Sequence, residues 1–302
     1  MNRKYSVCII IAGILWGTMG LFVRQLTPYF SAMQIVSIRS FFSMIIFFIV
    51  LLIKNKKLLI IPLKDVWCFI GTGCFSIVLF NYCYFRTIIT SSLSLAVILL
   101  YTSPIFVILL SRILFKEKIT LQKIMAIIIM ITGLIFITDI FGSRPALNIL
   151  GILIGLGAGL GYGLYSIFGR YALAKKYNTL TICFYTFLFA FLGTLPFISI
   201  AETFTVIVMD VQTLLLVVSL AVFVSVLPYI CYTTGLSRID TGTASILACI
   251  EPVVAALIGT FIYKETLKPA EFLGVVLVIL AVITLQIGNR NIKRSKITGA
   301  TH

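Results

Sequence analysis

The chain has 302 residues, of which 61% are hydrophobic and 11% charged, and its mean hydropathy is +1.16. A soluble protein carries about 25% charged residues to cover its surface, so this composition excludes a soluble globule and favours lipid as the surrounding solvent. The formal net charge of +15 would suggest nucleic acid in a soluble chain, but no basic run here alternates with stacking aromatics. A bilayer and a small-molecule solute are the expected partners, and nucleic acid is not.

Ten apolar runs, separated by charged or turn residues, follow one another along the chain. Because a spanning helix needs about 20 apolar residues, we predict an all-α polytopic membrane protein with ten transmembrane helices. The first run follows Arg3 and Lys4 as a signal peptide would, but it continues to Phe22 without an A-x-A site and is interpreted as a retained span. The expected spans are residues 6–23, 31–53, 66–85, 91–113, 120–139, 149–169, 178–199, 212–236, 241–262 and 269–287.

The basic residues predict the orientation, because Lys and Arg concentrate in cytoplasmic loops. With the N-terminus inside, 18 of the 24 Lys and Arg residues fall in inner segments and 5 in outer ones, while Arg39 lies within a span. We therefore expect a multi-pass protein of the cytoplasmic membrane with both termini in the cytoplasm.

The side chains usual in enzymes and metal sites are scarce. The only histidine is His302, and the seven cysteines lie in or beside apolar runs with no CxxC pair. There is no GxSxG motif and no P-loop, and a channel would need rings of charge or a repeated carbonyl filter. We expect no enzyme activity, no metal and no cofactor.

The two halves of the sequence, 1–140 and 141–302, resemble each other at a nearly constant offset. Pairs 148 residues apart are Pro104 with Pro252, Lys116 with Lys264 and Glu117 with Glu265. Pairs 146 residues apart are Trp16-Gly17 with Tyr162-Gly163, Phe22 with Phe168 and Arg24 with Arg170. Each half contains five predicted spans, and because five is odd the second half crosses the membrane in the opposite sense. Inverted repeats are typical of secondary transporters, although channels and scaffolds also arise by duplication.

The paired P-x₁₂-E segments that begin at Pro104 and Pro252 resemble the duplicated EamA domains of the drug/metabolite transporter superfamily. Further similar segments are ILWGTMGLFVR, YCYFRTIITSSLSLAVILLYTSP and PYICYTTGLSRIDTGTASILACIEPVVAAL, so the resemblance runs from about residue 10 to 287. It implies ten spans and the transport of amino acids, other metabolites or drugs, mostly outward, and it specifies no substrate. One position departs from repeat symmetry, because Ser103 stands where the second half has Glu251.

Glu251 is the sharpest functional signal, since an acid near the middle of a span costs about 2.5–3.5 kcal/mol on insertion scales. Helical spacing puts it on one face with small residues, so its carboxyl is expected to point into protein. That face consists of Ala244, Ala248, Glu251, Ala255 and Gly259. Pro252 also frees the Ala248 carbonyl. We interpret Glu251 as a site for an ammonium group or a coupling proton; the alternative is an acid that only locks two helices.

The other candidate substrate-binding residues are polar or aromatic side chains within spans. Arg39, in the second span, is a candidate to pair with Glu251 or to hold a substrate carboxylate, with snorkelling to the outer interface as the competing explanation. Amphipathic aromatic rings suit a small solute that has an apolar side chain or an amine. Side chains of this kind within spans are Trp16, Asn81, Tyr82, Tyr84, Tyr101, Tyr162, Tyr165, Tyr229 and Tyr232, and Ser103 is a further candidate.

Proline and glycine mark the expected hinge and packing positions. Pro104, Pro228 and Pro252 interrupt the fourth, eighth and ninth spans, and broken backbone at membrane depth is tolerated where it lines a cavity. Every-fourth glycines in the sixth span favour close helix packing over a direct role in binding. These are Gly151, Gly155, Gly159 and Gly163.

Together these patterns predict a secondary active transporter of small metabolites, amino acids in the first place, that works by alternating access in export or exchange. The alternative is a proton-coupled exporter of drugs or organic cations. The sequence does not specify the direction of transport, the coupling ion or the oligomeric state.

Overall fold

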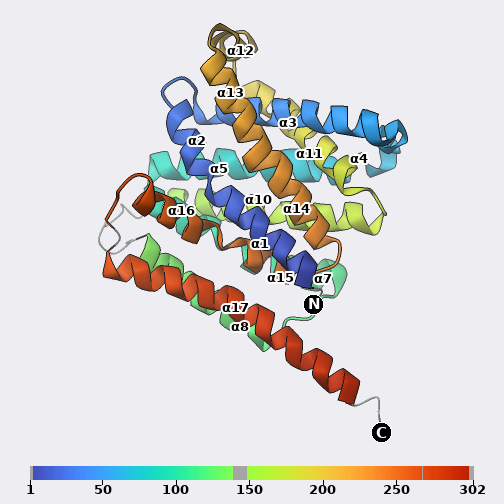
Figure 1. Ribbon diagram of the computed structural model, residues 1–302, viewed down its shortest axis with the longest axis vertical. Coiled ribbons are helices and arrows are strands. Elements are labelled where there is room, and N and C mark those ends of the chain that lie inside the picture. Colours follow the sequence, from blue (N-terminus) through green and yellow to red (C-terminus); the bar gives the residue numbers. More distant parts are fainter. Residues whose placement is uncertain (1–2, 139–147, 267, 299–302) are drawn as a thin grey trace.

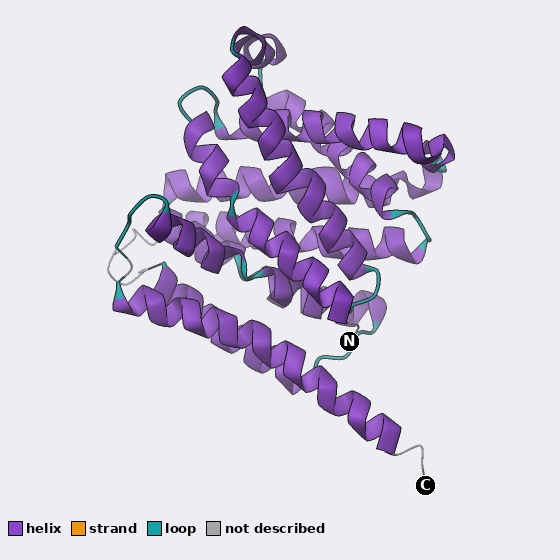
Figure 2. Ribbon diagram, in the orientation of Figure 1, coloured by secondary structure: helices purple, strands orange, loops and turns teal. Residues whose placement is uncertain are grey.

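The computed structural model describes residues 3–138, 148–266 and 268–298. Throughout this described part the regular structure is helical, with no strand (Figure 2). The expected boundary between the two halves, at residues 140 and 141, lies outside the described residues. The all-helical class that the composition predicts is therefore confirmed.

The first half of the chain runs from α1 to α8 (Figure 1). Its helices are α1 (Arg3–Gly17), α2 (Met19–Leu26), α3 (Ala32–Asn55), α4 (Val66–Ile70), α5 (Leu79–Thr90), α6 (Leu93–Leu100), α7 (Ser103–Phe115) and α8 (Leu121–Ile137). A π-helical stretch, η3 (Gly71–Val78), joins α4 to α5, and two short 3₁₀ turns, η1 (Lys56–Leu59) and η2 (Leu63–Asp65), follow α3.

The second half runs from α10 to α17. Its helices are α10 (Ile149–Ala174), α11 (Thr179–Thr194), α12 (Ile200–Met209), α13 (Val211–Leu220), α14 (Leu227–Leu236), α15 (Thr241–Ala248), α16 (Glu251–Phe261) and α17 (Pro269–Thr298). A second π-helical stretch, η5 (Ala221–Val226), joins α13 to α14, and a 3₁₀ turn, η4 (Leu195–Phe197), follows α11. Helix α12 falls between two predicted spans and was not predicted.

Eight segments of the described chain are long and apolar enough to cross a membrane. They are Arg3–Leu26, Ala32–Leu59, Leu63–Thr90, Leu93–Phe115, Ile149–Ala174, Thr179–Phe197, Val211–Leu236 and Thr241–Phe261. The fifth and tenth predicted spans correspond to shorter apolar helices, Leu121–Ile137 and Pro269–Leu285. The ten predicted spans are therefore represented by eight long segments and two shorter helices.

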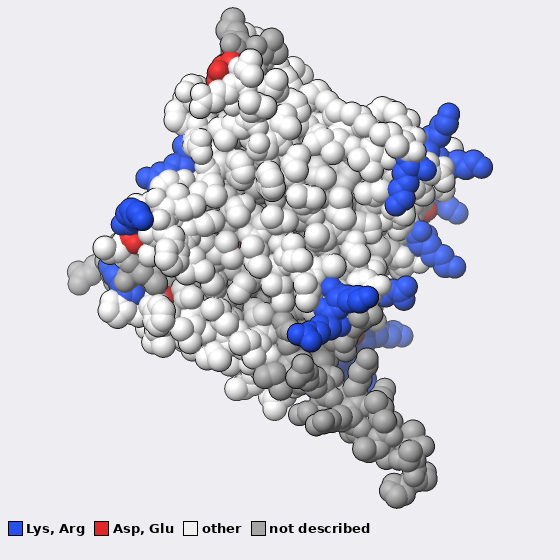
Figure 3. Space-filling view, in the orientation of Figure 1, with Lys and Arg blue, Asp and Glu red and all other residues white. Residues whose placement is uncertain are grey.

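The two shorter apolar helices form a pair at the edge of the bundle, where α17 packs mainly against α8 (Figure 1). Gly133 and Gly274 let them approach closely, because a Cβ on either glycine would lie 2.8 or 2.5 Å from the carbonyl oxygen of the other. On the face drawn in Figure 3, Lys and Arg gather at the ends of the helices and a wide uncharged surface lies between them. Such a band is what a lipid-facing surface requires.

One end of the bundle, here called the basic end, carries the C-terminus of α3, the N-terminus of α4 and the loop after α10. Lys175 Nζ donates a hydrogen bond to Asp65 Oδ1 at 2.5 Å, and the Tyr177 hydroxyl donates to Asp65 Oδ2 at 2.6 Å. The hydrogen bond to Asp65 raises the pKa of the Lys175 ammonium. Burial, followed by the same carboxylate, raises the pKa of Tyr177 to about 12. These contacts join the two halves of the chain.

The fourth and ninth spans are each broken into two helices at matching positions. The pair α6 and α7 and the pair α15 and α16 both break two residues before a proline, Pro104 or Pro252. Proline has no amide to continue the i to i−4 ladder, which accounts for the interruption. The interruption at Pro252 was expected, but the predicted helical face that runs from Ala244 through Glu251 to Gly259 was wrong, because Glu251 begins α16 after the break.

Two glycines hold the breaks in place. A Cβ on Gly13 of α1 would lie 2.7 Å from the Ala248 carbonyl oxygen, and one on Gly159 of α10 would lie 2.5 Å from that of Leu99. Each break is thus crossed by a helix of the other half of the chain, at backbone contact distance. This crossing places α1 and α10 beside the interrupted backbone, where the candidate site lies.

Candidate functional site

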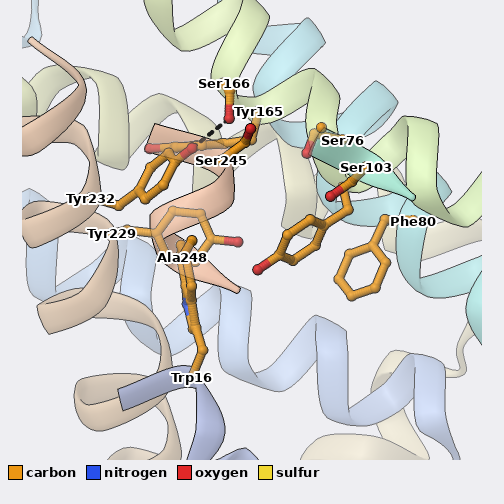
Figure 4. A pocket seen from close by; sticks show the side chains of 12 residues that line it. Trp16, Ser76, Phe80, Ser103, Tyr165, Ser166, Tyr229, Tyr232, Ser245 and Ala248 are labelled. Atoms are coloured by element: carbon orange, nitrogen blue, oxygen red, sulfur yellow. Dashed lines mark hydrogen bonds between the residues drawn. The ribbon is translucent and has the colours of Figure 1, made fainter. Parts of the chain in front are cut away.

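A cavity with about 410 Å³ of free space lies among α1, η3, α5, α7, α10, α14 and α15. It is bounded by both broken spans and by the two helices that cross them. Twelve residues line it: Trp16, Ser76, Phe80, Ser103, Tyr162, Gly163, Tyr165, Ser166, Tyr229, Tyr232, Ser245 and Ala248 (Figure 4). A lining of this composition, mostly aromatic with a few hydroxyls, is typical of sites that bind small molecules.

Aromatic rings form the wall of the cavity. The Trp16 indole packs edge-on against Tyr229, with ring centroids 5.3 Å apart, and tilted against Tyr232 at 5.4 Å. Tyr165 packs edge-on against Tyr229 at 4.9 Å, and Phe80 against Tyr162 at 5.3 Å. Rings in mutual contact are rigid, so this wall has a fixed shape and presents π faces or edges to whatever enters.

The tyrosine hydroxyls divide into those held by protein and those directed elsewhere. The Tyr165 hydroxyl is 2.6 Å from Thr233 Oγ1, and the Tyr232 hydroxyl is 2.6 Å from Ser166 Oγ, the dashed contact in Figure 4. These two hydroxyls therefore fix the positions of their rings. The hydroxyl of Tyr229 points into the middle of the group of side chains in Figure 4.

Tyr162 links the cavity to the carboxylate of Glu251. Its hydroxyl lines up with Glu251 Oε2 at 3.0 Å, donating a hydrogen bond across the space between α10 and α16. Tyr101, buried at the break between α6 and α7, also interacts with this carboxylate. Glu251 is therefore contacted by tyrosines from both halves of the chain, beside the cavity.

Arg39 lies on α3 and is 3% exposed. Its Nη1 atom is 3.9 Å from the Met19 sulfur, and its Nε atom is buried without a hydrogen-bond partner. The guanidinium charge interacts with Glu251 and Tyr229, but in the described part of the chain it forms no ion pair with an acid. This burial does not favour the snorkelling explanation, because a snorkelling head group lies in water. A buried, unpaired guanidinium is costly and calls for an anionic partner.

Only some of the other predicted substrate-binding residues line the cavity. Trp16, Ser103, Tyr162 and Tyr229 all line the cavity. Asn81 is buried but donates to the Ile77 carbonyl at 2.7 Å, a bond within its own helix. Tyr82 is 40% exposed and packs on Phe197, with ring centroids 5.4 Å apart. The structure therefore does not bring Asn81 and Tyr82 into the cavity wall.

The predicted hinge and packing residues lie at helix starts and crossings. Pro104, Pro228 and Pro252 each stand in the first turn of a helix, and Pro228 follows the π-helical stretch η5. Gly155, Gly159 and Gly163 face α6 and α7 at distances that admit no larger residue without a shift, which agrees with close packing.

Sequence reasoning missed several residues of the wall. Ser166 is one helical turn beyond Tyr162, and Ser76 lies one turn before Phe80, so a search along helical faces from the predicted aromatics would find some of them. Ser245 and Ala248 lie in the last turn of α15, just before the break. The missed set is Ser76, Phe80, Ser166 and Ser245, whereas Ala248 had been predicted to lie near Glu251.

The model of the EamA-like transporter family matches residues 3–139 and 149–286, which is nearly the whole chain. The chain belongs to the EamA-like transporter family. Membership in this family, together with the long apolar segments, makes it a multi-pass membrane transporter with a repeated fold.

The curated relatives of this EamA-like chain carry transporter names. An "Uncharacterized transporter" of Archaeoglobus fulgidus is 25% identical over 287 residues, covering 93% of this chain and 96% of that protein. The "Uncharacterized transporter YetK" of Bacillus subtilis is 26% identical over 221 residues, covering 72% and 66% of the two chains. A solved crystal structure superposes with a TM-score of 0.79 at 15% identity, covering 97% of this chain and 99% of that one, and it supports the fold alone.

Proposed function

We propose that this EamA-like chain is a secondary active transporter that moves small metabolites, amino acids in the first place, across the cytoplasmic membrane in export or exchange. The observation that carries the proposal is the hydrogen bond between Glu251, a carboxylate within a membrane-spanning segment, and Tyr162, which lines the aromatic cavity. Ionisable groups within membrane spans are expensive and usually serve a substrate or an ion.

In the proposed bound state Glu251 receives the ammonium group of the substrate. The position of the carboxylate beside the cavity supports this role, and the carbonyl groups released at the break before Pro252 supply further acceptors. Tyr162 keeps the carboxylate oriented through the other oxygen. When no substrate is bound, a proton takes the place of the ammonium, which would couple transport to the proton gradient.

Arg39 supplies the opposite charge. A zwitterionic amino acid carries a carboxylate as well as an ammonium group, and the buried guanidinium without an ion-pair partner is suited to receive it. Trp16, Tyr162 and Tyr229 then surround the side chain of the substrate. The combination of one buried acid and one buried base favours a zwitterion over a simple cation or anion.

The proposed cycle is alternating access. The basic end is assigned to the cytoplasm, with both termini there, because it collects the Lys and Arg residues of the inner loops. Five spans in each half make the second repeat inverted relative to the first, so that rocking one repeat against the other exposes the cavity to each side in turn. Matching breaks at Pro104 and Pro252 provide two related points where the backbone can bend.

A second candidate is a proton-coupled exporter of drugs or organic cations. The observation that favours it is the aromatic wall with an adjacent carboxylate, since cations bind to the faces of Trp and Tyr rings. Arg39 disfavours the export of organic cations, because a buried positive charge near the site repels a cationic substrate.

The test is counterflow in proteoliposomes. The purified protein is reconstituted with a high internal concentration of an unlabelled amino acid, and uptake of trace labelled amino acids is measured for large apolar, small polar and charged examples. We expect saturable exchange that a few zwitterions compete for, and none in liposomes without protein. Exchange of organic cations in its place would favour the second candidate. Exchange of no amino acid by folded protein would overturn the amino-acid proposal.

A further inference from the structure

At the basic end, one carboxylate ties the two broken spans together. Glu117, just beyond α7, accepts hydrogen bonds from the Thr241 amide and hydroxyl at 2.9 and 2.7 Å and from the Gly242 amide at 3.3 Å. Arg170 Nη2 lies 3.8 Å from this carboxylate, and Arg170 Nε donates to the Thr241 hydroxyl at 3.0 Å. We call these four residues, Glu117, Arg170, Thr241 and Gly242, the basic-end contact. It caps the first turn of α15 with a charged group from α7, a favourable arrangement.

The opposite end of the bundle holds the same parts in a different state. Glu265 and Arg24 match Glu117 and Arg170 in the repeat, and their charged atoms are 3.5 Å apart. Their side chains are 65% and 61% exposed, against 13% and 19% for Glu117 and Arg170. Arg24 lies over the ring of Tyr263, 4.1 Å from its centroid, instead of contacting a helix start.

The local backbone at Glu117 and Glu265 is the same, so the two acids differ only in whether a helix start lies within reach of the carboxylate. Lys116 and Lys264 both adopt left-handed φ values, 56° and 58°. The following amides, of Glu117 and Glu265, donate to Ser111 and Gly259 carbonyl oxygens at 3.2 and 3.1 Å, again 148 residues apart. Each acid is therefore presented by an equivalent turn, ready for an equivalent partner.

That partner exists at the start of α6. Helices α6 and α15 begin 148 residues apart, and their N-caps, Ser92 and Asp240, each accept a bond from the amide three residues on, at 3.1 and 3.0 Å. Leu93 and Ser94 occupy the places of Thr241 and Gly242. In the described chain, the amides of Leu93 and Ser94 donate to no side chain, whereas those of Thr241 and Gly242 bind Glu117.

The two broken spans connect the basic end of the bundle with the opposite end. One broken span starts at Leu93 and ends beside Glu117, and the other starts at Thr241 and ends beside Glu265. Helix α7 packs on α15, but α6 and α16 make no comparable contact within the described residues (Figure 1). Tyr101 at one break interacts with Glu251 at the other, so the two spans meet at their breaks. Tilting the spans about this meeting point would close one pair of ends while the other pair separates.

We propose that Glu265 and Arg24 form a second, alternative contact with the amides of Leu93 and Ser94, and that it closes when the basic-end contact opens. This proposal rests on the proposed function, since it identifies the residues that hold each side shut in alternating access. The structure then represents the state that is closed at the basic end. Glu265 and Arg24 act as positioning residues, and they contribute little to the state in which they are exposed.

The test measures distance and not transport. Spin labels are placed at the opposite end, at Gln25→Cys and Leu93→Cys, in the full chain with its seven native cysteines replaced. The distance between the two labels is measured by pulsed electron paramagnetic resonance in substrate-free liposomes. Both positions are exposed, and a cysteine at residue 93 retains the backbone amide. Glu117→Gln weakens the basic-end contact, so we expect a shorter-distance population to increase about tenfold, as for a lost charged hydrogen bond.

The second substitution decides the proposal. Adding Glu265→Gln to Glu117→Gln is expected to remove the shorter-distance population, whereas the matched control Glu271→Gln, a carboxylate at the same end that caps Lys268, retains it. If the population persists without the Glu265 carboxylate, or if Glu117→Gln produces none, the proposal is overturned. Thr241→Ala, which deletes one hydrogen bond of the contact, replaces Glu117→Gln if that variant does not fold.

The result is separable from the substrate question. Amino-acid counterflow with no change in these distances would overturn the alternative contact and leave the proposed function standing. Distances that change as expected, in a protein that exchanges no amino acid, would support the contact and overturn the amino-acid assignment.

Discussion

The two breaks, before Pro104 and before Pro252, have the same backbone plan and different chemistry. In each, a helix of eight residues ends, two residues turn, and a second helix begins with a proline in its first turn. The first residue of the second helix is Ser103 in one break and Glu251 in the other. The repeat therefore specifies a symmetric frame, and the residues within it make the site asymmetric: Tyr101, Thr102 and Ser103 stand where the second half has Cys249, Ile250 and Glu251.

This asymmetry suggests how a duplicated fold serves one substrate at a time. Two equivalent acids would bring two like charges into one cavity, and one of them would be forced neutral. With Ser103 opposite Glu251, only one carboxylate is available, and a hydroxyl remains to line the cavity on the other side. The mechanical role of the breaks is shared, while the binding role is concentrated in one.

The largest expected effect comes from removing the acid. Glu251→Gln keeps the shape and leaves an oxygen for the Tyr162 hydroxyl, but it removes the charge that receives the ammonium group. We expect amino-acid counterflow to fall at least about a hundredfold, as when one member of a buried charge pair is lost. The matched change in the other break, Ser103→Ala, is expected to cost less than about fivefold. Normal transport by Glu251→Gln at all pH values would contradict both the binding and the coupling role.

Substitution of Gly13 and Gly159, the glycines of the crossing helices, tests whether the two breaks contribute equally to the stability of the fold. A Cβ on Gly13 would meet the Ala248 carbonyl at 2.7 Å, and one on Gly159 the Leu99 carbonyl at 2.5 Å. Gly13→Ala and Gly159→Ala are each expected to destabilise the folded protein by about 1–3 kcal/mol, the usual cost of overpacking. Thermal unfolding in detergent measures this.

Gly20 supplies the control for the glycine prediction. No atom lies within 4 Å of a Cβ built there, and the residue is helical. Gly20→Ala should therefore leave stability unchanged or raise it by up to about 1 kcal/mol, from helix propensity alone. If Gly13→Ala behaves like Gly20→Ala, the breaks are not held by backbone contact.

Substitution of Arg39 tests whether substrate binding at the Glu251 break needs a buried positive charge in addition to the carboxylate. Arg39→Gln removes the guanidinium that interacts with Glu251, and we expect counterflow of zwitterions to fall about tenfold. An amine that lacks the carboxylate should lose less, because its contact with Glu251 remains. Competition between labelled amino acid and the matching amine gives the ratio. An equal loss for both compounds would show that Arg39 does not hold the carboxylate.

The smallest effect concerns the caps at the starts of the broken spans. Burial alone would raise the pKa of the Asp240 carboxyl, but the Lys123 ammonium paired with it lowers that pKa below its ordinary value. The stability that this adds is present above the ordinary pKa of about 4 and is lost as the pH falls through the lower folded value. Asp240→Asn should remove this acid sensitivity from the unfolding curve between about pH 5 and about pH 3. Ser92→Ala, the matched cap, should not, since a serine hydroxyl does not titrate there.

Much of the fold was predictable because its cause is local. Apolar runs and turn residues predicted the helices, and the offset of 148 residues predicted that the two P-x₁₂-E segments would be structural equivalents. Interruptions at Pro104 and Pro252 were expected, but not that each would separate two helices and change which residues share a face. A proline is compatible with a kink, a break or an unbroken helix start, and packing against Gly13 and Gly159 decides among these.

The cavity was predictable in part for a related reason. Trp16, Tyr162 and Tyr229 are large amphipathic residues deep in spans, and they meet as expected. Tyr82 has the same character but lies about 100° around its helix from Asn81, and that rotation faces it outward. The hydrogen bonds of Glu117 join residues more than 120 positions apart, and no local pattern specifies such a contact.

The position of Trp16 has a practical consequence. The sequence contains two tryptophans, and the other, Trp67, packs against Phe168 and Tyr171 away from the cavity lining. Trp16, in contact with Tyr229 and Tyr232, is therefore a built-in fluorophore whose emission responds to the contents of the cavity. With Trp67→Phe to remove the second emitter, the binding of unlabelled compounds becomes an optical titration that needs neither a radiolabel nor a membrane gradient.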